Sequence, residues 1–511
     1  MPHTPTAEQS AIILAARERS ESLLIRAYAG CAKTSTLEML APLVPTSSAL
    51  ALAFNVKIKK ELEKRLPSHF DVKTLNGLGH SAWQRFLGRK LELDDRKLGR
   101  LVTTELKASG FDASQDDWTA IRELVSLAMR SGLVPREFHK EGLVLDSAES
   151  WADLASEQFT PCTEAMQAIS RDVLVASIKE AFKGLISFDD QIYCSAMLGG
   201  IFPKYPLVLV DEAQDLSVLN HLQVKRTASD RLIVVGDEKQ AVYQFRGADS
   251  QSINKLRSLR DSWIELPLAT TFRCPKIIVE RSRGHAPGFI AWESNPDGHF
   301  AHWQKVESSD GWDWAQVQDL ADALGPMSSV AVLCRNNAPL ISLAFKLLRQ
   351  QIGVVMLGRD IGKGLVALAK KLMPDDSTPA VECAQLIEAW RERECSLAKA
   401  KDQESKISGI TDRAECLQAI LSGSSAADAG ALRLATERLF NRESGHVTLA
   451  TGHRAKGLEW DVVLHLDPFR IPSKFAIRAG GAQMEQERNL NYVIETRTRH
   501  TLIAANLEDF K

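Results

Sequence analysis

The amino-acid sequence predicts an α/β fold with two parallel sheets, each covered by helices, and with helical insertions in both parts. Short, almost continuously apolar runs recur, and each is followed by a polar turn and a helical pattern. Such runs are typical of parallel strands that are buried on both faces of a sheet. They form an early and a late set, at residues 22–28, 48–54, 205–212 and 231–237, and at 329–335, 446–453, 461–467 and 491–497.

Two long segments between these strands read as helices instead. The first, from about residue 81 to 186, has amphipathic periodicity, and the second, from about 363 to 442, is polar and rich in alanine. Both are expected to be insertions into the α/β parts. The predicted domains are a first α/β domain of 1–80 plus 187–268, an insertion of 81–186, a second α/β domain of 269–362 plus 443–511, and a short insertion of 363–442.

The composition indicates several hydrophobic cores, because 44% of the 511 residues are hydrophobic. Lys and Arg number 63 against 65 Asp and Glu, so any positive groove for a nucleic acid must be local. The eight cysteines have no paired or metal-ligand spacing, which predicts a reducing compartment and no zinc or iron–sulfur site. Without a targeting pattern or an apolar run of ~18 residues, a cytoplasmic protein with no membrane partner is expected.

A candidate phosphate loop joins the first apolar run to a helix through small residues followed by Lys33 and Thr34. In such a loop backbone N–H groups and a helix N-terminus face the phosphates, the lysine reaches the β and γ groups, and the hydroxyl holds Mg²⁺. Ala27 and Ala32 occupy both glycine positions of this pattern, which alanine tolerates where φ is negative. The motif alone does not distinguish a phosphate loop from a strand-to-helix turn with an exposed lysine.

Asp211 and Glu212 directly follow the third apolar run, where the carboxyl edge of a parallel sheet forms ligand sites. Asp211 is a candidate for the Mg²⁺ shell, and Glu212 for polarising the water that attacks the γ-phosphate. The alternative is that these acids only end a strand and cap a helix. Four acidic or amide groups within five residues favour the catalytic interpretation.

The next run ends in a similar polar loop, which contains Gln240, Tyr243, Phe245 and Arg246. Gln240 is a candidate sensor of the γ-phosphate. The aromatic side chains are candidate stacking faces for single-stranded bases, each worth on the order of 1–3 kcal/mol. The alternative is that Tyr243 and Phe245 only pack beneath the loop.

The order and wording of these motifs resemble the UvrD/Rep-like branch of superfamily 1 DNA helicases, especially its compact members similar to F-box helicases and phage-encoded relatives. The resemblance spans nearly the whole chain, and eight motifs in the right order are far more specific than any one of them. In chain order the matching segments are TAEQSAII, AYAGCAKTS, LAFNVKIKKELEKRLP with VKTLNGLGHSAW, VDEAQD, VVGDEKQAVYQFRGAD, TTFRCP, TGHRAKGLEWDVV and QERNLNYVIETRTRHTLIA.

The resemblance implies RecA-like motor domains of the P-loop NTPase class, with ATP and Mg²⁺ as cofactors. Gln9 would read the adenine edge, Arg273 and Arg497 would contact the γ-phosphate from the second motor domain, and Tyr492 would pack near the nucleotide. Glu459 would bind the ribose. The phosphate-loop residues implied in nucleotide binding are Ala29, Gly30, Cys31, Ala32, Lys33, Thr34 and Ser35. The residues implied along DNA are Phe54, Asn55, Thr74, Asn76, His80, Tyr243, Phe245, Arg246, Thr451, His453 and Lys456.

The function that the resemblance implies is an ATP-dependent DNA helicase or translocase that moves 3′ to 5′ on single-stranded DNA and separates duplex DNA. Its partners would be single-stranded and tailed duplex DNA and, because the second insertion is short, a protein loader or regulatory subunit. Two alternatives stay open. One is a DNA-dependent ATPase that remodels protein–DNA complexes with little unwinding, and the other is a nucleotide-binding scaffold in a repair or defence complex. The setting would be the cytoplasm of a bacterial or phage-infected cell, in DNA repair or replication.

Overall fold

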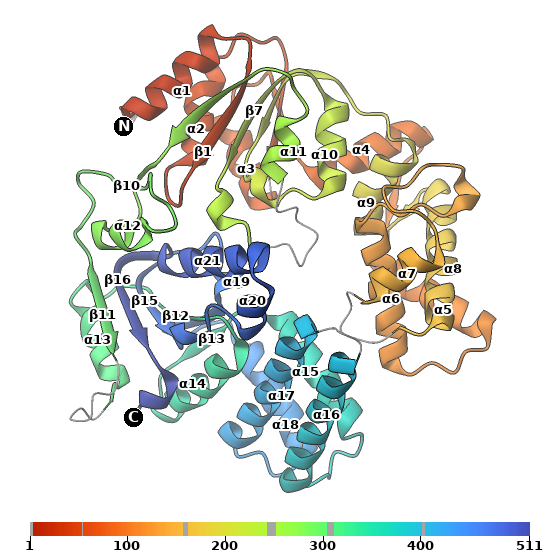
Figure 1. The fold of residues 1–511 in the computed structure, drawn as a ribbon, viewed down its shortest axis with the longest axis vertical. Helices are drawn as coiled ribbons and strands as arrows, with labels where there is room; N and C mark the ends of the chain where they lie inside the picture. Colours follow the sequence, from red (N-terminus) through yellow and green to blue (C-terminus); the bar gives the residue numbers. More distant parts are fainter. Residues whose placement is uncertain (1–3, 54, 157–161, 243–251, 304–310, 401–403) are drawn as a thin grey trace. The chain divides into compact units, whose positions relative to one another are not determined.

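The computed structural model describes residues 4–53, 55–156, 162–242, 252–303, 311–400 and 404–511 (Figure 1). The chain forms two compact units, and each is described by itself. The first unit comprises Met1–Ala27 and Ala32–Ala269, and the second comprises Tyr28–Cys31 and Thr270–Lys511.

The first unit contains a six-stranded, entirely parallel sheet. Its central strands are almost fully buried, as the apolar runs predict, because helices cover both faces. All four early strands are confirmed, and two edge strands are added. In spatial order the sheet consists of β3 (Phe70–Thr74), β2 (Ala49–Ala53), β6 (Tyr205–Val210), β7 (Ala228–Gly236), β1 (Ser22–Ala27) and β8 (Trp263–Leu268).

Five helices of this unit connect or flank the sheet strands. Most begin with a side-chain cap, which supplies an acceptor for the free N–H groups of the first turn. In α1 the hydroxyl of Thr6 accepts from the backbone N–H of Gln9. The helices are α1 (Ala7–Glu18), α2 (Lys33–Leu40), α3 (Val56–Arg65), α10 (Val218–Thr227) and α11 (Ser252–Arg257).

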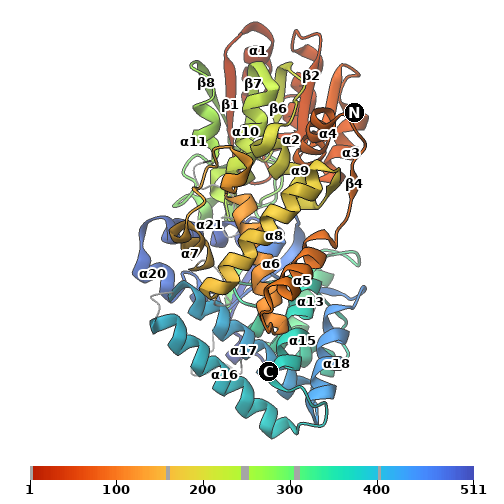
Figure 2. The ribbon, with the colours of Figure 1, turned by 90° about the vertical axis from the view of Figure 1, so that its right-hand side faces the viewer.

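The segment predicted for residues 81–186 is helical, and its apolar side chains form one hydrophobic cluster together with residues of 193–198 and Leu219. Its long helices α5, α6 and α8 pack on one another, as Figure 2 shows. The short strands β4 (Glu92–Leu93) and β5 (Leu185–Ile186) pair beside them. The helices are α4 (Leu75–Leu87), α5 (Lys97–Ser109), α6 (Gln115–Arg130), α7 (Ala148–Ser156), α8 (Glu164–Phe182) and α9 (Phe188–Tyr193).

The second unit contains another six-stranded parallel sheet, so the predicted fold class is confirmed. A separate pair, β9 (Thr270–Thr271) and β10 (Ile290–Ala291), precedes it. In spatial order the sheet consists of β11 (His299–Trp303), β16 (Thr498–Ala505), β15 (Trp460–Leu466), β12 (Val330–Cys334), β14 (Val447–Thr451) and β13 (Val354–Met356).

One predicted strand of the late set is wrong. Residues 491–497 form the end of helix α21 (Gly481–Glu495) and the turn after it, and the strand follows as β16. The buried side chains Leu490, Val493 and Ile494 have the i, i+3, i+4 spacing of a helix face. Because Val, Ile and Thr are frequent in strands, their local composition concealed this longer helical period.

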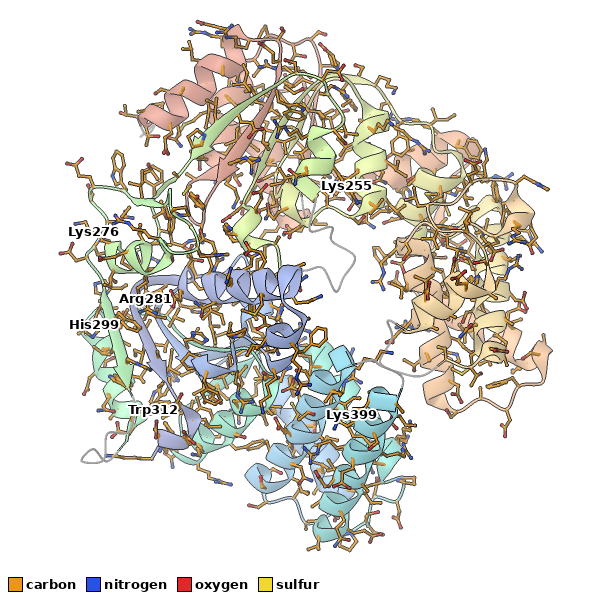
Figure 3. The ribbon with its side chains drawn as sticks, in the orientation of Figure 1. Lys255, Lys276, Arg281, His299, Trp312 and Lys399 are labelled. Atoms are coloured by element: carbon orange, nitrogen blue, oxygen red, sulfur yellow. The ribbon has the colours of Figure 1, made fainter. Side chains whose placement is uncertain are left out.

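Helices surround the second sheet as they do the first. Trp312, labelled in Figure 3, is buried at the edge of this unit, where its indole N–H donates to the carbonyl of Asn506 at 2.7 Å. Its ring meets that of Phe510 nearly edge-on, with centroids 4.6 Å apart. The helices are α12 (Lys276–Ser282), α13 (Trp314–Asp322), α14 (Asn337–Arg349), α19 (Gly452–Ala455), α20 (Lys474–Ala479) and α21.

The segment predicted as the short second insertion is also helical. Its helices share one hydrophobic cluster with the strands and helices of the second sheet, and α17 packs directly on α14. The bounds of the four predicted domains stay a prediction. The helices are α15 (Arg359–Leu372), α16 (Ala380–Ala400), α17 (Glu404–Ser424) and α18 (Ala429–Phe440).

Over the residues that the structure describes, no helix combines the length and apolarity that a membrane crossing requires. The eight cysteines all lie in the described part of the chain, and none of them forms a disulfide. The same described residues contain no group of three or more His, Cys, Asp and Glu side chains arranged to hold a metal ion.

Candidate nucleotide and DNA sites

The candidate phosphate loop leaves the sheet at Ala27, the last residue of β1, and Lys33 begins α2. Ala27 is in extended strand conformation, where alanine is tolerated as expected. Ala32 is different, because its φ of 55° and ψ of 42° place it in the left-handed region. The condition of a negative φ is therefore not met at Ala32, and this position carries backbone strain.

We expect Ala32→Gly to stabilise the protein modestly. A left-handed conformation costs a non-glycine residue about 1–2 kcal/mol. Glycine also gives the unfolded chain more conformational freedom, and this offsets about 0.4–1 kcal/mol of the stabilisation. A higher apparent melting temperature of the variant, measured by differential scanning fluorimetry, checks the balance.

Ala27→Gly is the matched control, because a glycine in a buried strand destabilises by about 0.5–1 kcal/mol. If both substitutions lower the melting temperature alike, Ala32 is not strained.

Four side chains of the first unit converge where β6 and the phosphate loop end. The Thr34 hydroxyl donates to Asp211 Oδ2 at 2.9 Å, and Lys33 Nζ lies 3.5 Å from Glu212 Oε1. Glu212 itself has a φ of 49°, a second left-handed position next to the cluster. Burial and the neighbouring Glu212 carboxylate raise the pKa of Asp211 to about 6, although Lys33 opposes the shift. The predicted lysine, hydroxyl and two acids are thus brought together.

The raised pKa of Asp211 predicts that, without metal, the free energy of unfolding falls as pH rises. A carboxyl whose folded pKa exceeds its unfolded value contributes stability below the unfolded pKa, and that contribution is lost as pH rises through about 6. Asp211→Asn keeps the shape without the charge, so the variant should gain stability relative to the unmodified protein by about 1–1.5 kcal/mol between pH 5 and pH 7.5. Melting temperatures of both proteins across this range, without Mg²⁺, test the prediction. A pH-independent difference would contradict it.

Behind these residues lies a second buried acid, Asp237, which follows β7. Gln240 donates through Nε2 to Asp237 Oδ2 at 2.5 Å, and the backbone N–H of Asp237 donates to Gln214 Oε1 at 2.9 Å. Gln214 in turn donates to Glu212 Oε2 at 2.6 Å, so an amide chain links Gln240 to Glu212. Burial raises the pKa of Asp237, and the Lys33 charge lowers it.

Sequence reasoning identified Gln240 but missed Asp237 and Gln214. The signal was present, because Asp237 ends an apolar strand in the same way as Asp211. The neighbouring candidates Tyr243, Phe245 and Arg246 lie outside the described residues.

Gln9 is buried beside α2. Its Oε1 accepts from the backbone N–H of Thr6 at 3.0 Å, and its Nε2 donates to Thr36 Oγ1 at 3.1 Å. These two bonds fix the side-chain amide. Its NH₂ group has a second N–H that takes part in neither of them. Ser35 lies half-buried on α2.

The remaining loop residues group with the second unit by their contacts. The Ala29 N–H donates to the Tyr492 hydroxyl at 2.9 Å, and the Phe272 N–H donates to the Gly30 carbonyl at 3.0 Å. Cys31 is buried. Gly30 has a φ of 69°, and a Cβ there would lie 2.7 Å from Thr271 Oγ1, so only glycine fits.

The DNA candidates of the first unit lie at the carboxyl ends of β2 and β3. Asn55 caps α3 and is exposed, and Thr74 caps α4. Asn76 donates to Gln191 Oε1 at 3.0 Å, and His80 Nδ1 lies 3.3 Å from Gln191 Nε2. The i, i+4 spacing places Asn76 and His80 on one face of α4. Gln191 on α9 contacts both Asn76 and His80, and sequence reasoning missed it. The candidate Phe54 lies outside the described residues.

In the second unit Arg273 forms an ion pair with Glu459, so two residues that were predicted to meet different parts of a nucleotide meet each other. Arg497 is 1% exposed. Its guanidinium donates to the carbonyls of Val493 at 3.0 Å and Leu458 at 3.3 Å. Burial of this guanidinium could not be predicted from the motif.

Three further DNA candidates of the second unit surround the short helix α19. Thr451 is buried and precedes the helix, His453 lies within it, and Lys456 follows it. The side chains of His453 and Lys456 are half-buried. The structure therefore places these three residues together at the end of β14.

Comparison with known proteins matches two family models to this chain. Residues 6–260 match the UvrD/REP helicase N-terminal domain, and residues 382–508 match the UvrD-like helicase C-terminal domain. "F-box DNA helicase protein 1" of Schizosaccharomyces pombe is 24% identical over 98% of this chain and 57% of its own length. "ATP-dependent DNA helicase UvrD2" of Mycobacterium bovis is 24% identical over 93% of this chain and 75% of its own.

Other relatives match over shorter stretches. A "Probable DNA helicase II homolog" of Rickettsia conorii is 26% identical over 49% of this chain and 40% of its own length. The chain thus spans between about two fifths and three fifths of the lengths of the F-box and Rickettsia relatives.

Proposed function

Because the chain belongs to the UvrD/Rep-like family of superfamily 1 DNA helicases, we propose that it is a DNA-stimulated ATPase that moves 3′ to 5′ along single-stranded DNA and separates duplex DNA. Its two parallel sheets are the RecA-like parts of this family. The observation that carries the proposal is the convergence of Lys33, Thr34, Asp211 and Glu212 at one sheet edge.

The residues at this edge fit Mg²⁺ and a nucleoside triphosphate. The Thr34 hydroxyl and the Asp211 carboxylate are oxygen ligands of the type that Mg²⁺ prefers, and they already lie within hydrogen-bonding distance. When bound, the ion neutralises charge that develops on the β- and γ-phosphate oxygens. We propose that Lys33 binds those phosphates through its ammonium group and that Glu212 orients and deprotonates the attacking water, which their proximity supports.

Arg273 and Arg497 are proposed, on the family's motif order, to bind the γ-phosphate, and Glu459 to bind the ribose. A planar guanidinium suits this role because it stays charged and offers a fixed fork of donors. In the described second unit Arg273 is paired with Glu459 and Arg497 donates to backbone carbonyls. Each guanidinium carries five N–H donors, so phosphate binding would add to these contacts or replace some of them.

The proposed DNA path includes Asn76, His80 and the residues around α19. In the first unit the hydrogen bonds of Gln191 fix the two side chains on α4, so the surface that they present is preorganised. Contacts with the phosphate backbone should make DNA affinity fall steeply as salt rises, with little sequence preference. The 3′ to 5′ direction comes from the family resemblance alone.

Steady-state ATP hydrolysis with and without single-stranded DNA tests the activity, and displacement of a labelled strand from duplexes with a 3′ or a 5′ tail tests the direction. We expect strong DNA stimulation and displacement from the 3′-tailed substrate only. Preference for the 5′ tail would overturn the polarity. No hydrolysis under any DNA condition would leave the nucleotide-binding scaffold.

A translocase with little unwinding is the second candidate, and the packing of α15–α18 into the core of the second sheet favours it. A short insertion that shares a core with the motor has little freedom to act as a separate strand-separating element. Release of streptavidin from a biotinylated single strand, without displacement of a tailed duplex, would identify this activity.

A further inference from the structure

A groove of about 610 Å³ lies within the second unit, and its lining shares no residue with the motifs used above. Its walls come from α14, from the end of α17 and the turn after it, and from α18, which pack together (Figure 1). None of its residues belongs to the proposed nucleotide or DNA sites.

The floor of the groove is apolar. Phe345 of α14 lies on Gly423 of α17 so closely that a Cβ at Gly423 would be 2.5 Å from the Phe345 ring. Leu348 and Leu439 extend this floor, and Leu434 lines the groove although 46% of its surface is exposed. Exposed apolar surface beside a concave floor is typical of a binding site for apolar side chains.

The rim of the groove is positive. Arg349, Arg438 and Arg442 line it, and its lining includes no acidic residue. Arg349 donates to the Gly423 carbonyl at 2.8 Å, which fixes its position over the end of α17. In the part of the chain that the structure describes, Arg438 and Arg442 form no ion pair, so their charges are available to a partner.

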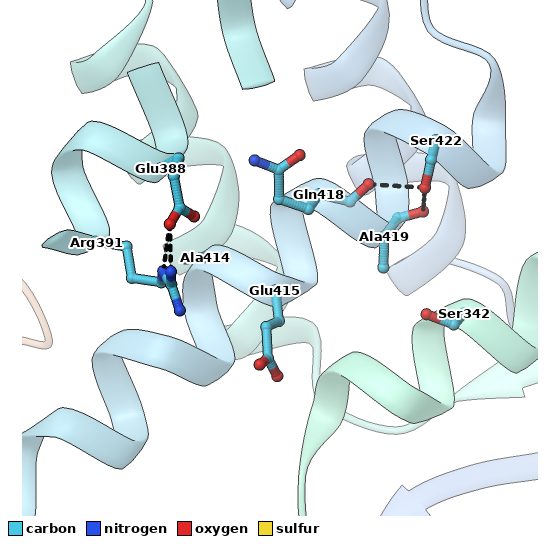
Figure 4. Close-up of a pocket in the computed structure, with 8 residues that line it drawn as sticks. All are labelled: Ser342, Glu388, Arg391, Ala414, Glu415, Gln418, Ala419 and Ser422. Carbon is cyan, nitrogen blue, oxygen red and sulfur yellow. Dashed lines mark hydrogen bonds and ion pairs between the residues drawn. The ribbon is translucent and has the colours of Figure 1, made fainter. Parts of the chain in front are cut away.

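A neighbouring cavity of the same unit provides a contrast (Figure 4). It is lined by Ser342, Glu388, Arg391, Glu415 and Gln418 among others, and its arginine is paired with Glu388. Positive and negative groups therefore compensate each other in that cavity. The arginine rim of the groove is not compensated in this way.

We infer that this groove, the arginine-rimmed groove, binds an acidic amphipathic segment of a partner protein. Apolar side chains of such a segment fill the floor, and its Asp and Glu side chains meet the three arginines. A nucleic acid would satisfy the charges but would leave the Phe345, Leu348 and Leu434 surface without an apolar partner. The peptide is therefore the better fit, and the inference stands independently of the ATPase.

A fluorescein-labelled synthetic peptide of about 16 residues, with Leu and Phe at helical i, i+4, i+7 spacing and Asp and Glu elsewhere, is the probe. Fluorescence anisotropy with the full chain, without nucleotide or DNA, should show saturable binding. Arg438→Glu with Arg442→Glu should weaken binding at least about 10-fold, since two attractive charge pairs become repulsive. A peptide with Lys in place of its acids should bind this doubly reversed variant better than the unmodified protein.

Lys399→Glu is the matched control, because Lys399 is an exposed cation on α16 outside the groove (Figure 3). It should leave peptide affinity unchanged, and unaltered melting temperatures of all variants exclude unfolding as the cause. No saturable binding, or an equal loss with Lys399→Glu, overturns the inference. If the double reversal instead weakens a labelled oligothymidine and spares the peptide, the groove belongs to nucleic acid.

Discussion

Replacing Glu212 with glutamine is expected to lower kcat for ATP hydrolysis by about 10²–10⁴-fold, the range of a lost general base. Glutamine has nearly the same shape and still accepts the hydrogen bond that Gln214 donates to Glu212 at 2.6 Å. Nucleotide binding should therefore persist, because the phosphate-binding N–H groups and Lys33 are unaltered. Steady-state hydrolysis at saturating single-stranded DNA and binding of a fluorescent ATP analogue measure the two effects separately.

Glu238→Gln is the matched control, because Glu238 follows the neighbouring strand β7 and pairs at the surface with Arg26. It should hydrolyse ATP at nearly the unmodified rate. Lys33→Ala should lose both hydrolysis and nucleotide affinity, since it removes the ammonium group beside Glu212. Full hydrolysis by Glu212→Gln would reject Glu212 as the base and leave the rest of the cluster as a binding site.

The position of this site at the edge of the sheet was predictable, because the site lies where strands end. Strand β6 is an uninterrupted apolar run, so the edge position of Asp211 and Glu212 follows from the sheet itself. The left-handed conformation of Ala32 was not predictable, because the surrounding loop imposes it against the preference of alanine. Asp237 was missed although its signal was present.

The features of the second unit that the sequence did not predict have a different cause. Residues 491–497 were predicted as a strand from local composition, whereas the helix α21 is set by the spacing of buried side chains over several turns. The pairing of Arg273 with Glu459 joins residues distant in sequence, which motif order alone does not reveal. The DNA-contacting roles stay predictions.

The second large effect is expected in the helical segment of the first unit, where Lys97 and Asp190 form an ion pair with both side chains 0% exposed. Lys97 Nζ donates to Asp190 Oδ2 at 2.6 Å and to the Ser177 carbonyl at 2.8 Å, so its ammonium group is well satisfied. Lys97→Met should destabilise this segment by about 3–5 kcal/mol, because it leaves a buried carboxylate without its counter-charge.

Adding Asp190→Asn to Lys97→Met should restore much of that loss, since the double variant buries no charge and asparagine still accepts from the Ser187 N–H. Because the chain has two units, global unfolding is not a two-state measure, and hydrogen exchange of α5 and α8 peptides gives the local opening free energy instead. Arg100→Met joins the comparison because it breaks an exposed pair with Glu180 between the same two helices, which is worth about 0–1 kcal/mol. If Lys97→Met opens α5 and α8 no more than Arg100→Met does, the buried pair contributes only what an exposed one contributes. Recovery in the double variant would instead show that the stability depends on charge balance rather than on either side chain alone.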